Sequence, residues 1–401
     1  MRYLTVMFSI FLTVLVAIAS FNWFIDPFAM YWSPQVDGIN SVKPEAEKRS
    51  RISKAYRIED VHPQILIVGN SRVEMGLDPN NAVFKGQRVY NQGIPGATIR
   101  MQVDYAINAI NTEPELTSIL MSVDFLDFLL NDNDIDLLKV NDNAINSYDF
   151  RLIQPDDNKI FAQFERLKEK ASLIFSLDAL VASFKTITSQ ESLVNHINTE
   201  GFNSANLYLS ILKTEGIIPL FNKKLTSVTQ RLTNQSLGII AQNTYPYSIN
   251  FQNLGRLITT AHKKNIQVTF FINPYHFSYL HTLAENKQWD NFNVWKKTLV
   301  KYFQNNQDNK VTLWDFSLFN SVINEEVPIT NPNQQMKWFW EPAHYKKELG
   351  NIMLKQMDFQ NNQSNIGIKL NQSNIEQVIQ QGDEGLINSQ AQWEVLKNDI
   401  R

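Results

Sequence analysis

The sequence predicts an α/β fold: a mainly parallel, doubly wound sheet between two layers of helices, in a three-layer α/β/α arrangement. Short β-rich runs alternate with helical segments, which is the pattern of parallel strands joined by crossover helices. Polar residues follow directly after these runs, at the sheet edge where doubly wound folds bind ligands. An uncharged apolar run at the N-terminus adds a membrane-spanning helix to this prediction.

Length, charge and cysteine content narrow the class of protein. The 401 residues suffice for one large α/β domain with insertions or for two domains. A net charge of −3 implies no broad basic surface for nucleic acid. The absence of cysteine excludes disulfides, thiol chemistry and zinc–thiolate sites. Because no dinucleotide, P-loop or zinc-protease motif and no metal-ligand spacing occurs, neither a cofactor nor a metal is predicted.

The N-terminal run Leu4–Phe24 is long enough to span the roughly 30 Å hydrocarbon core of a membrane. Arg2 precedes it, and no Lys or Arg follows before Lys43, which predicts a single-pass anchor with the remaining chain outside. The alternative is a signal peptide cleaved after Ala17-Ile18-Ala19. We favour an uncleaved anchor over residues 1–24, because apolar character continues past Ala19. In both cases the globular part is exported.

The predicted α/β domain covers residues 61–358 and follows a polar juxtamembrane linker, residues 25–60. Proline in Asp26-Pro27 and Ser33-Pro34 interrupts any helix in the linker. Five β-rich runs form the predicted strands: Ile65–Val68, Val89-Tyr90, Ile119–Val123, Gln267–Ile272 and Val311–Trp314. Apolar periodicity predicts the helices Thr98–Ile110, Ile249–Lys264 and Phe292–Phe303.

Two further segments differ from this alternating pattern. Residues 130–235 are rich in Asn, Asp, Ser and Lys, with amphipathic patches at Phe161–Phe175 and Leu177–Phe184. We interpret them as a helical insertion that serves as a lid or a partner surface. Residues 359–401 are predicted to be a polar C-terminal appendage with one short helix, Ile375–Gln381, after a capping-box pattern.

Five candidate site residues each follow a predicted strand: Ser71, Gly93, Asp124, Asn273 and His344. The tetrapeptide Gly69-Asn70-Ser71-Arg72 predicts a strand that ends in a tight turn, with a hydroxyl at the start of a helix. Glu341 stands three residues before His344. A nucleophile first, with a carboxylate and a histidine near the end, suggests a serine hydrolase or acyltransferase.

The motifs Gly69-Asn70-Ser71-Arg72, Asn91-Gln92-Gly93 and Glu341-Pro342-Ala343-His344 resemble those of the SGNH (GDSL-like) hydrolase superfamily. More closely, the chain resembles its membrane-anchored envelope type, which includes proteins similar to alginate O-acetyltransferase-like factors and the D-alanyl transfer protein of teichoic acids. The resemblance covers residues 62–130 and 250–355 and implies an SGNH-hydrolase-like fold. The chain departs from the family pattern at Asn70 and Glu341, where the family has Asp, and has Ser122-Val123-Asp124 in place of Gly-x-Asn-Asp.

The resemblance implies a catalytic set of three residues. Ser71 would be the nucleophile, His344 the base that takes its proton, and Glu341 the carboxylate that orients the imidazole. The superfamily can also use a backbone carbonyl in the place of Glu341. Each residue has a structural alternative as well: Ser71 as a helix N-cap, His344 as a packing or solvent-exposed side chain. Together, the motifs favour the catalytic interpretation.

The remaining site candidates are assigned to the oxyanion or the substrate. Gly93 would donate its backbone N–H to the oxyanion beside that of Ser71, or serve only as a turn glycine. Asp124 would hold an acceptor hydroxyl, pair with Arg72 or cap the next helix. Arg72 would bind an anionic sugar or phosphate, or form an ion pair with Asp124 or Glu74.

Three other features are candidates for substrate contact. Asn273 follows the fourth strand, and His276 stands three residues after it. The aromatic residues of Trp338-Phe339-Trp340 would stack on sugar rings or fill the core.

Two functions from different classes therefore remain open. The first is a membrane-anchored periplasmic serine esterase or O-acyltransferase that acts on a cell-envelope glycan in the bacterial inner membrane environment. The second is a non-catalytic binding or scaffold subunit of an envelope complex on the same fold. The predicted partners are the inner membrane, the glycan or acyl-ester substrate and a membrane protein; nucleic acid is not among them.

Overall fold

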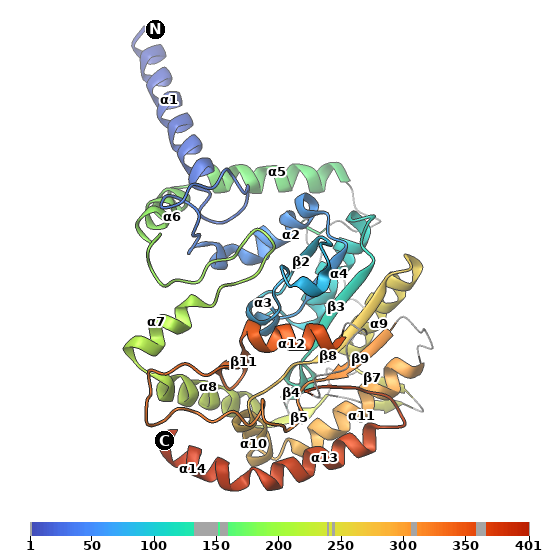
Figure 1. The fold of residues 1–401 in the computed structure, drawn as a ribbon. Helices are drawn as coiled ribbons and strands as arrows, with labels where there is room; N and C mark the ends of the chain where they lie inside the picture. The colour runs from blue at the N-terminus through green and yellow to red at the C-terminus, as the bar shows by residue number, and fades with distance from the viewer. Residues whose placement is uncertain are drawn as a thin grey trace. The chain divides into compact units, whose positions relative to one another are not determined.

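The chain divides into two units, which we name the anchor unit and the sheet unit. The computed structural model describes residues 2–131, 151–152, 159–238, 240–242, 245–305, 311–357 and 366–400. The anchor unit comprises Met1–Val61 and Tyr148–Ser210, and the sheet unit comprises His62–Ser147 and Ile211–Arg401. Figure 1 shows the elements of both.

The sheet unit is built on a six-stranded, mainly parallel sheet in the order β12-β9-β8-β3-β1-β2, as far as the described residues show. Its five parallel strands are β1 (Ile65–Val68), β2 (Val89–Asn91), β3 (Ser118–Val123), β8 (Gln267–Ile272) and β9 (Val311–Asp315). The antiparallel edge strand β12 (Ile368–Lys369) pairs with β9. The predicted α/β class and parallel sheet are confirmed, and all five predicted strands are present within one residue at each end.

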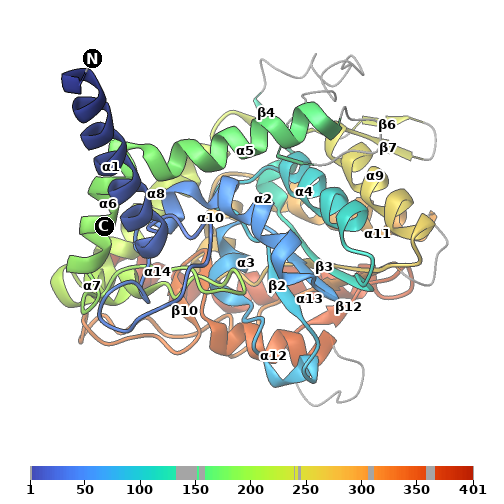
Figure 2. The same cartoon turned by 90° about the horizontal axis from the view of Figure 1, so that it is seen from above.

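Helices cover the sheet because its central strands are apolar on both faces. All four residues of β1 and five of the six in β3 are buried, so both faces need a covering layer. Figure 2 shows α4 (Ile99–Thr112) and α9 (Ile249–Lys263) on one side of the sheet and α12 (Lys347–Met357) on the other. Further helices of this unit are α3 (Ser71–Gly76), α8 (Ile217–Leu232), α10 (Phe277–Glu285) and α11 (Trp289–Asn305).

Short elements complete the sheet unit. They are the 3₁₀ helices η2 (Ala82–Phe84) and η3 (Phe125–Phe128), and the two-stranded pairs β4 (Leu129–Asn131) with β5 (Gln235–Leu237), β6 (Ile240–Gln242) with β7 (Tyr245–Tyr247), and β10 (Phe339–Glu341) with β11 (His344–Tyr345). The last pair is an antiparallel hairpin that contains Glu341 and His344, so the prediction that His344 follows a strand of the parallel sheet is wrong.

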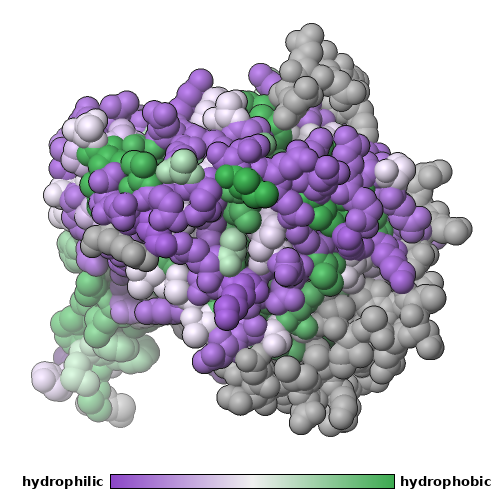
Figure 3. Space-filling model, turned by 90° about the horizontal axis from the view of Figure 1, so that it is seen from below, coloured by the Kyte–Doolittle hydropathy of each residue, from purple (hydrophilic) through white to green (hydrophobic). Residues whose placement is uncertain are grey.

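The predicted C-terminal appendage is instead part of the sheet unit. Its strand β12 joins the sheet, and it continues as α13 (Ile375–Asn388) and α14 (Gln390–Ile400). Apolar side chains such as Val378 and Trp393 are buried in the unit, which is why this polar segment folds. Figure 3 views the molecule from below Figure 1, where α13 and α14 lie, and the surface on this side is mainly hydrophilic.

The predicted linker, residues 25–60, is also part of a folded unit, and its helices begin only after the two prolines. It contains η1 (Ala46–Arg49) and α2 (Ser50–Val61) and lies in the anchor unit. The buried Lys43 donates from Nζ to the carbonyls of Ile25 (2.9 Å) and Asp26 (3.0 Å), and so satisfies carbonyls at the end of the N-terminal helix. The Asp26 carboxylate in turn accepts the backbone N–H of Met30 at 2.8 Å.

The predicted insertion, residues 130–235, contributes to both units rather than forming one lid. Helices α5 (Lys159–Phe175) and α6 (Leu177–Thr188) belong to the anchor unit, whereas α8 belongs to the sheet unit. Helix α7 (Asn206–Thr214) spans the boundary between the two ranges. Residues 132–150 and 153–158 of this range lie outside the described residues.

The N-terminal helix α1 (Arg2–Ile25) is long and apolar enough to cross a membrane. Its apolar side chains are largely exposed, as a span within lipid requires. A signal sequence meets the same criterion of length and composition. The orientation across the membrane stays a prediction from the charge distribution.

Candidate active site

The turn after β1 places Ser71 at the first position of α3. The N-cap is Asn70, with extended backbone angles (φ −98°, ψ −160°), and its Oδ1 accepts the N–H of Arg72 at 3.0 Å. The alternative that Ser71 caps the helix is therefore wrong. With the capping role filled by Asn70, the Ser71 hydroxyl is left for another partner.

Two glycines let this turn pack tightly. A Cβ at Gly69 would lie 2.4 Å from the Val73 side chain and 2.5 Å from Ser122 Oγ. A Cβ at Gly93 would lie 2.7 Å from the backbone nitrogen of Glu74, in α3. Both positions require glycine because the backbone approaches closely.

Ser71, His344 and Glu341 form one hydrogen-bonded chain. The Ser71 Oγ lies 2.8 Å from His344 Nε2, although the two residues are 273 positions apart in the sequence. His344 Nδ1 contacts Glu341 Oε1, and Glu341 Oε2 accepts the N–H of Ala343 at 2.9 Å. The β10–β11 hairpin thus holds the imidazole between a carboxylate and a hydroxyl, which is the geometry that proton transfer from serine requires.

The electrostatics of the set keep the carboxylate charged and the imidazole neutral. Burial raises the pKa of the Glu341 carboxyl, but His344 and Lys224 outweigh burial and lower this pKa to about 2. Burial lowers the pKa of His344 below its ordinary value, against the opposing effect of Glu341. A neutral His344 at neutral pH can accept the Ser71 proton.

Lys224 belongs to the site although no sequence motif predicts it. Its Nζ, on α8, lies 3.4 Å from Glu341 Oε1. The local sequence of α8 shows only an amphipathic helix, and Glu341 is more than a hundred residues further on. No local pattern could therefore have identified this ion pair.

Arg72, the residue after Ser71, forms a buried ion pair with Asp124. Arg72 contacts Asp124 Oδ2 through its guanidinium, and its Nε donates to the Ala343 carbonyl at 2.8 Å. The Tyr275 hydroxyl donates to Asp124 Oδ1 at 3.2 Å, and its ring lies 5.2 Å from the guanidinium. Of the alternatives, the ion pair is present and Asp124 also caps η3 by accepting the N–H of Leu126. Substrate binding does not fit, because the Arg72 and Asp124 side chains are almost fully buried.

Three other candidates have structural partners. Gly93 N–H donates to Asn91 Oδ1 at 2.8 Å, so the expected oxyanion donor is already engaged. The fully buried Asn273 accepts the Tyr345 hydroxyl at 3.3 Å and so supports the residue next to His344. His276 is buried between Ser278 Oγ and the Glu325 carbonyl, and burial lowers its pKa to about 4. These contacts correct the assignment of Gly93 to the oxyanion and of Asn273 and His276 to the substrate.

The aromatic candidates divide between the core and the surface. Phe339 is buried and its ring lies 5.4 Å from that of His276, so it is core material. Trp338 and Trp340 are partly exposed and pack against the ammonium groups of Lys337 and Lys346, at 4.3 and 4.2 Å from the ring centres.

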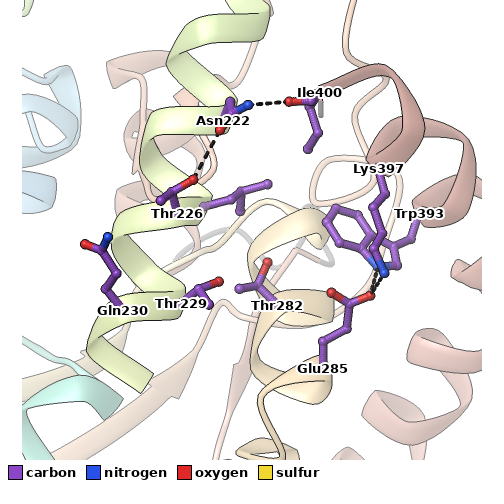
Figure 4. Close-up of a pocket in the computed structure, with 10 residues that line it drawn as sticks. Asn222, Thr226, Thr229, Gln230, Thr282, Glu285, Trp393, Lys397 and Ile400 are labelled. Carbon is purple, nitrogen blue, oxygen red and sulfur yellow. Dashed lines mark hydrogen bonds and ion pairs between the residues drawn. The ribbon is translucent and has the colours of Figure 1, made fainter. Parts of the chain in front are cut away.

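A pocket of about 250 Å³ lies between α8, α10 and α14, lined by none of the predicted site residues (Figure 4). Figure 4 shows Thr226 of α8 and Thr282 of α10 on opposite sides of it. Trp393 Nε1 donates to Glu285 Oε1 at 3.0 Å, and Lys397 contacts the same oxygen. Helix α8 thus lines this pocket and also carries Lys224, which pairs with Glu341.

In the part of the chain that the structure describes, no group of three or more His, Asp and Glu side chains could hold a metal ion.

Two comparisons with known proteins find no relative of this chain. No protein-family model matches the chain. No curated protein matches it either.

Proposed function

We propose that the protein is a membrane-anchored serine esterase or O-acyltransferase of the SGNH type, acting on acyl esters of a cell-envelope glycan. The observation that carries the proposal is the Ser71–His344–Glu341 chain, with 2.8 Å between serine and imidazole. The order of the motifs along the sequence and the position of Ser71 just after the parallel strand β1 support it.

The proposed reaction has two steps. Ser71 Oγ attacks the acyl carbonyl carbon while His344 Nε2 takes the hydroxyl proton, and Glu341 stabilises the resulting imidazolium. The C–O bond to the leaving alcohol breaks, and that alcohol takes the proton from His344. An acceptor hydroxyl, from water or a sugar, then loses its proton to His344 and attacks the acyl carbon of the acyl-serine. The bond between that carbon and Ser71 Oγ breaks, and His344 returns the proton to Ser71 Oγ.

The substrate class follows from the location. An N-terminal helix long and apolar enough to cross a membrane supports a membrane anchor, and Arg2 before it with no Lys or Arg before Lys43 supports a body outside, which we propose is the bacterial periplasm. Acylated envelope glycans are the ester substrates that such a body can reach. A membrane protein that presents the acyl donor is a natural partner in the transferase case.

One observation favours the second candidate, a non-catalytic envelope protein on the same fold. Because Gly93 N–H is engaged by Asn91, a second oxyanion donor beside Ser71 N–H is not identified among the described residues.

A labelling experiment separates the two candidates. Full-length protein in detergent is treated with a fluorophosphonate probe, with Ser71→Ala as the matched control. The enzyme should label and the control should not, and the enzyme should cleave a small acetyl ester. Absence of both labelling and cleavage in the folded wild type would favour the scaffold.

A further inference from the structure

Helix α5 has its amphipathic faces reversed relative to an ordinary surface helix. Its largely buried Arg166 contacts Glu59, and Glu169 accepts the Tyr56 hydroxyl at 2.6 Å. The apolar side chains point the other way: Phe164 is 61% exposed and Leu167 is 67% exposed. A surface helix of a soluble protein buries its apolar stripe and leaves its charges in water.

The next helix, α6, shows the same reversal. Its small residues Ala179, Ala182 and Ser183 are buried, whereas Leu177 and Val181 are exposed. Because α5 and α6 meet at Ser176 with a bend of 58°, their exposed apolar residues occupy two consecutive helices.

Both helices are fixed to the end of the membrane helix α1. Asn22, in the last turns of α1, donates to the Ile174 carbonyl of α5 at 2.7 Å. Ser183 of α6 donates to Asn22 Oδ1 at 3.0 Å, and the Phe184 ring lies 5.3 Å from that of Phe21. Figure 1 shows α5 running across the direction of α1 within this unit.

We infer that α5 and α6 lie in the interface of the bilayer that α1 crosses, with their exposed apolar side chains among the lipid acyl chains. This inference rests on α1 crossing a membrane and goes beyond the proposed activity. A helix of this kind lies in the plane of the interface, with its apolar face roughly 5–10 Å deep at the boundary of head groups and acyl chains.

The bilayer fits this surface better than the other occupants do. The pair is not a broken span, because Arg166 and Glu169 on its inner face are bound to charged and hydroxyl groups of the protein. Lys168 lies on the exposed side of α5, one turn after Phe164, and its ammonium is 3.7 Å from Glu165 Oε2; with 68% of the side chain exposed, its long stem lets the ammonium reach lipid head groups. Trp23 is exposed one residue after Asn22, as interfacial tryptophans are.

The test uses the absence of cysteine in the chain, which permits single labelling sites. Phe164→Cys, Leu167→Cys and Val181→Cys are made separately in the full-length protein, labelled with an environment-sensitive fluorophore and reconstituted into phosphatidylethanolamine–phosphatidylglycerol vesicles. Emission is measured with a lipid that carries a quencher on its acyl chain, and separately with iodide in the water. Val14→Cys, in the middle of α1, reports whether the anchor itself is in lipid.

The matched control is an exposed apolar side chain outside α5 and α6. Ile387→Cys, 72% exposed in the native protein, is an apolar position on α13. We expect lipid quenching and protection from iodide at the three test sites, and the reverse at the control.

The other outcomes overturn the inference. Iodide quenching at the test sites, with lipid quenching at Val14→Cys, would put the helix pair in water although the anchor is inserted. Protection from both quenchers would mean that protein, such as a second copy, covers the face. Equal lipid quenching at Ile387→Cys would show that the label, not the position, seeks the membrane.

Discussion

Helices α5 and α8 come from the same predicted insertion, yet α8 buries its apolar face and α5 exposes its own. Helix α8 buries Leu220, Phe221 and Val228 in the sheet unit and directs Lys224 to the candidate triad. Helix α5 buries Arg166 and leaves Phe164 and Leu167 exposed. Apolar periodicity therefore shows that a helix has two faces, but only the neighbouring elements decide which face is buried.

The largest effect on activity is expected at the nucleophile Ser71 and its base His344, in the site to which α8 contributes Lys224. Ser71→Ala and His344→Ala should each lower kcat for ester cleavage by a factor on the order of 10⁴ or more, and the double variant should be little worse than either. Thermal unfolding should change little. Nearly independent, multiplicative losses in the double variant would contradict a shared proton-transfer unit.

The second effect is a loss of stability when the buried Phe221 of α8 is truncated. Phe221→Ala on α8 removes a fully buried ring and should cost about 3–5 kcal/mol of unfolding free energy. The measurement is denaturant unfolding of the full-length protein in detergent micelles. A cost below about 1 kcal/mol would mean that α8 does not pack as described.

Ser71 was predictable because it follows a strand, whereas Glu341 and His344 lie in an antiparallel hairpin that was not predicted. The strand Ile65–Val68 and the turn at Ser71 each have a recognisable local sequence pattern. In a parallel sheet the carboxyl ends of the strands meet at one edge, where ligands bind. Three other contacts could not be predicted, because they form between residues that no local pattern connects. They are the Lys224–Glu341 ion pair, the Arg72–Asp124 ion pair and the hydrogen bond from Gly93 N–H to Asn91. The folded C-terminal segment was missed because its few buried apolar residues are spread among polar ones.

The third effect is a shift in the pH profile. Because burial lowers the His344 pKa, activity should be lost on acidification only below the ordinary histidine range, when the imidazole becomes protonated. The Lys224 ammonium also lowers this pKa, so Lys224→Met should raise it and move the acidic limb to higher pH. Lys223→Met, on the exposed side of the same helix, is the control and should leave the profile in place. Identical shifts in both variants would exclude a specific Lys224–Glu341 effect.

The smallest effect is expected at Phe164 on α5, and it completes the comparison with Phe221. Phe164 is mostly exposed in the folded protein, so its truncation removes little buried area and leaves no cavity. In detergent micelles, Phe164→Ala should therefore change the free energy of unfolding by no more than about 0.5 kcal/mol. The same substitution should weaken the contact with the bilayer, since each aromatic ring withdrawn from lipid forfeits about 1.5–3 kcal/mol of transfer free energy. A large loss of stability in micelles would show that the ring packs against protein, and α5 would then no longer differ from α8.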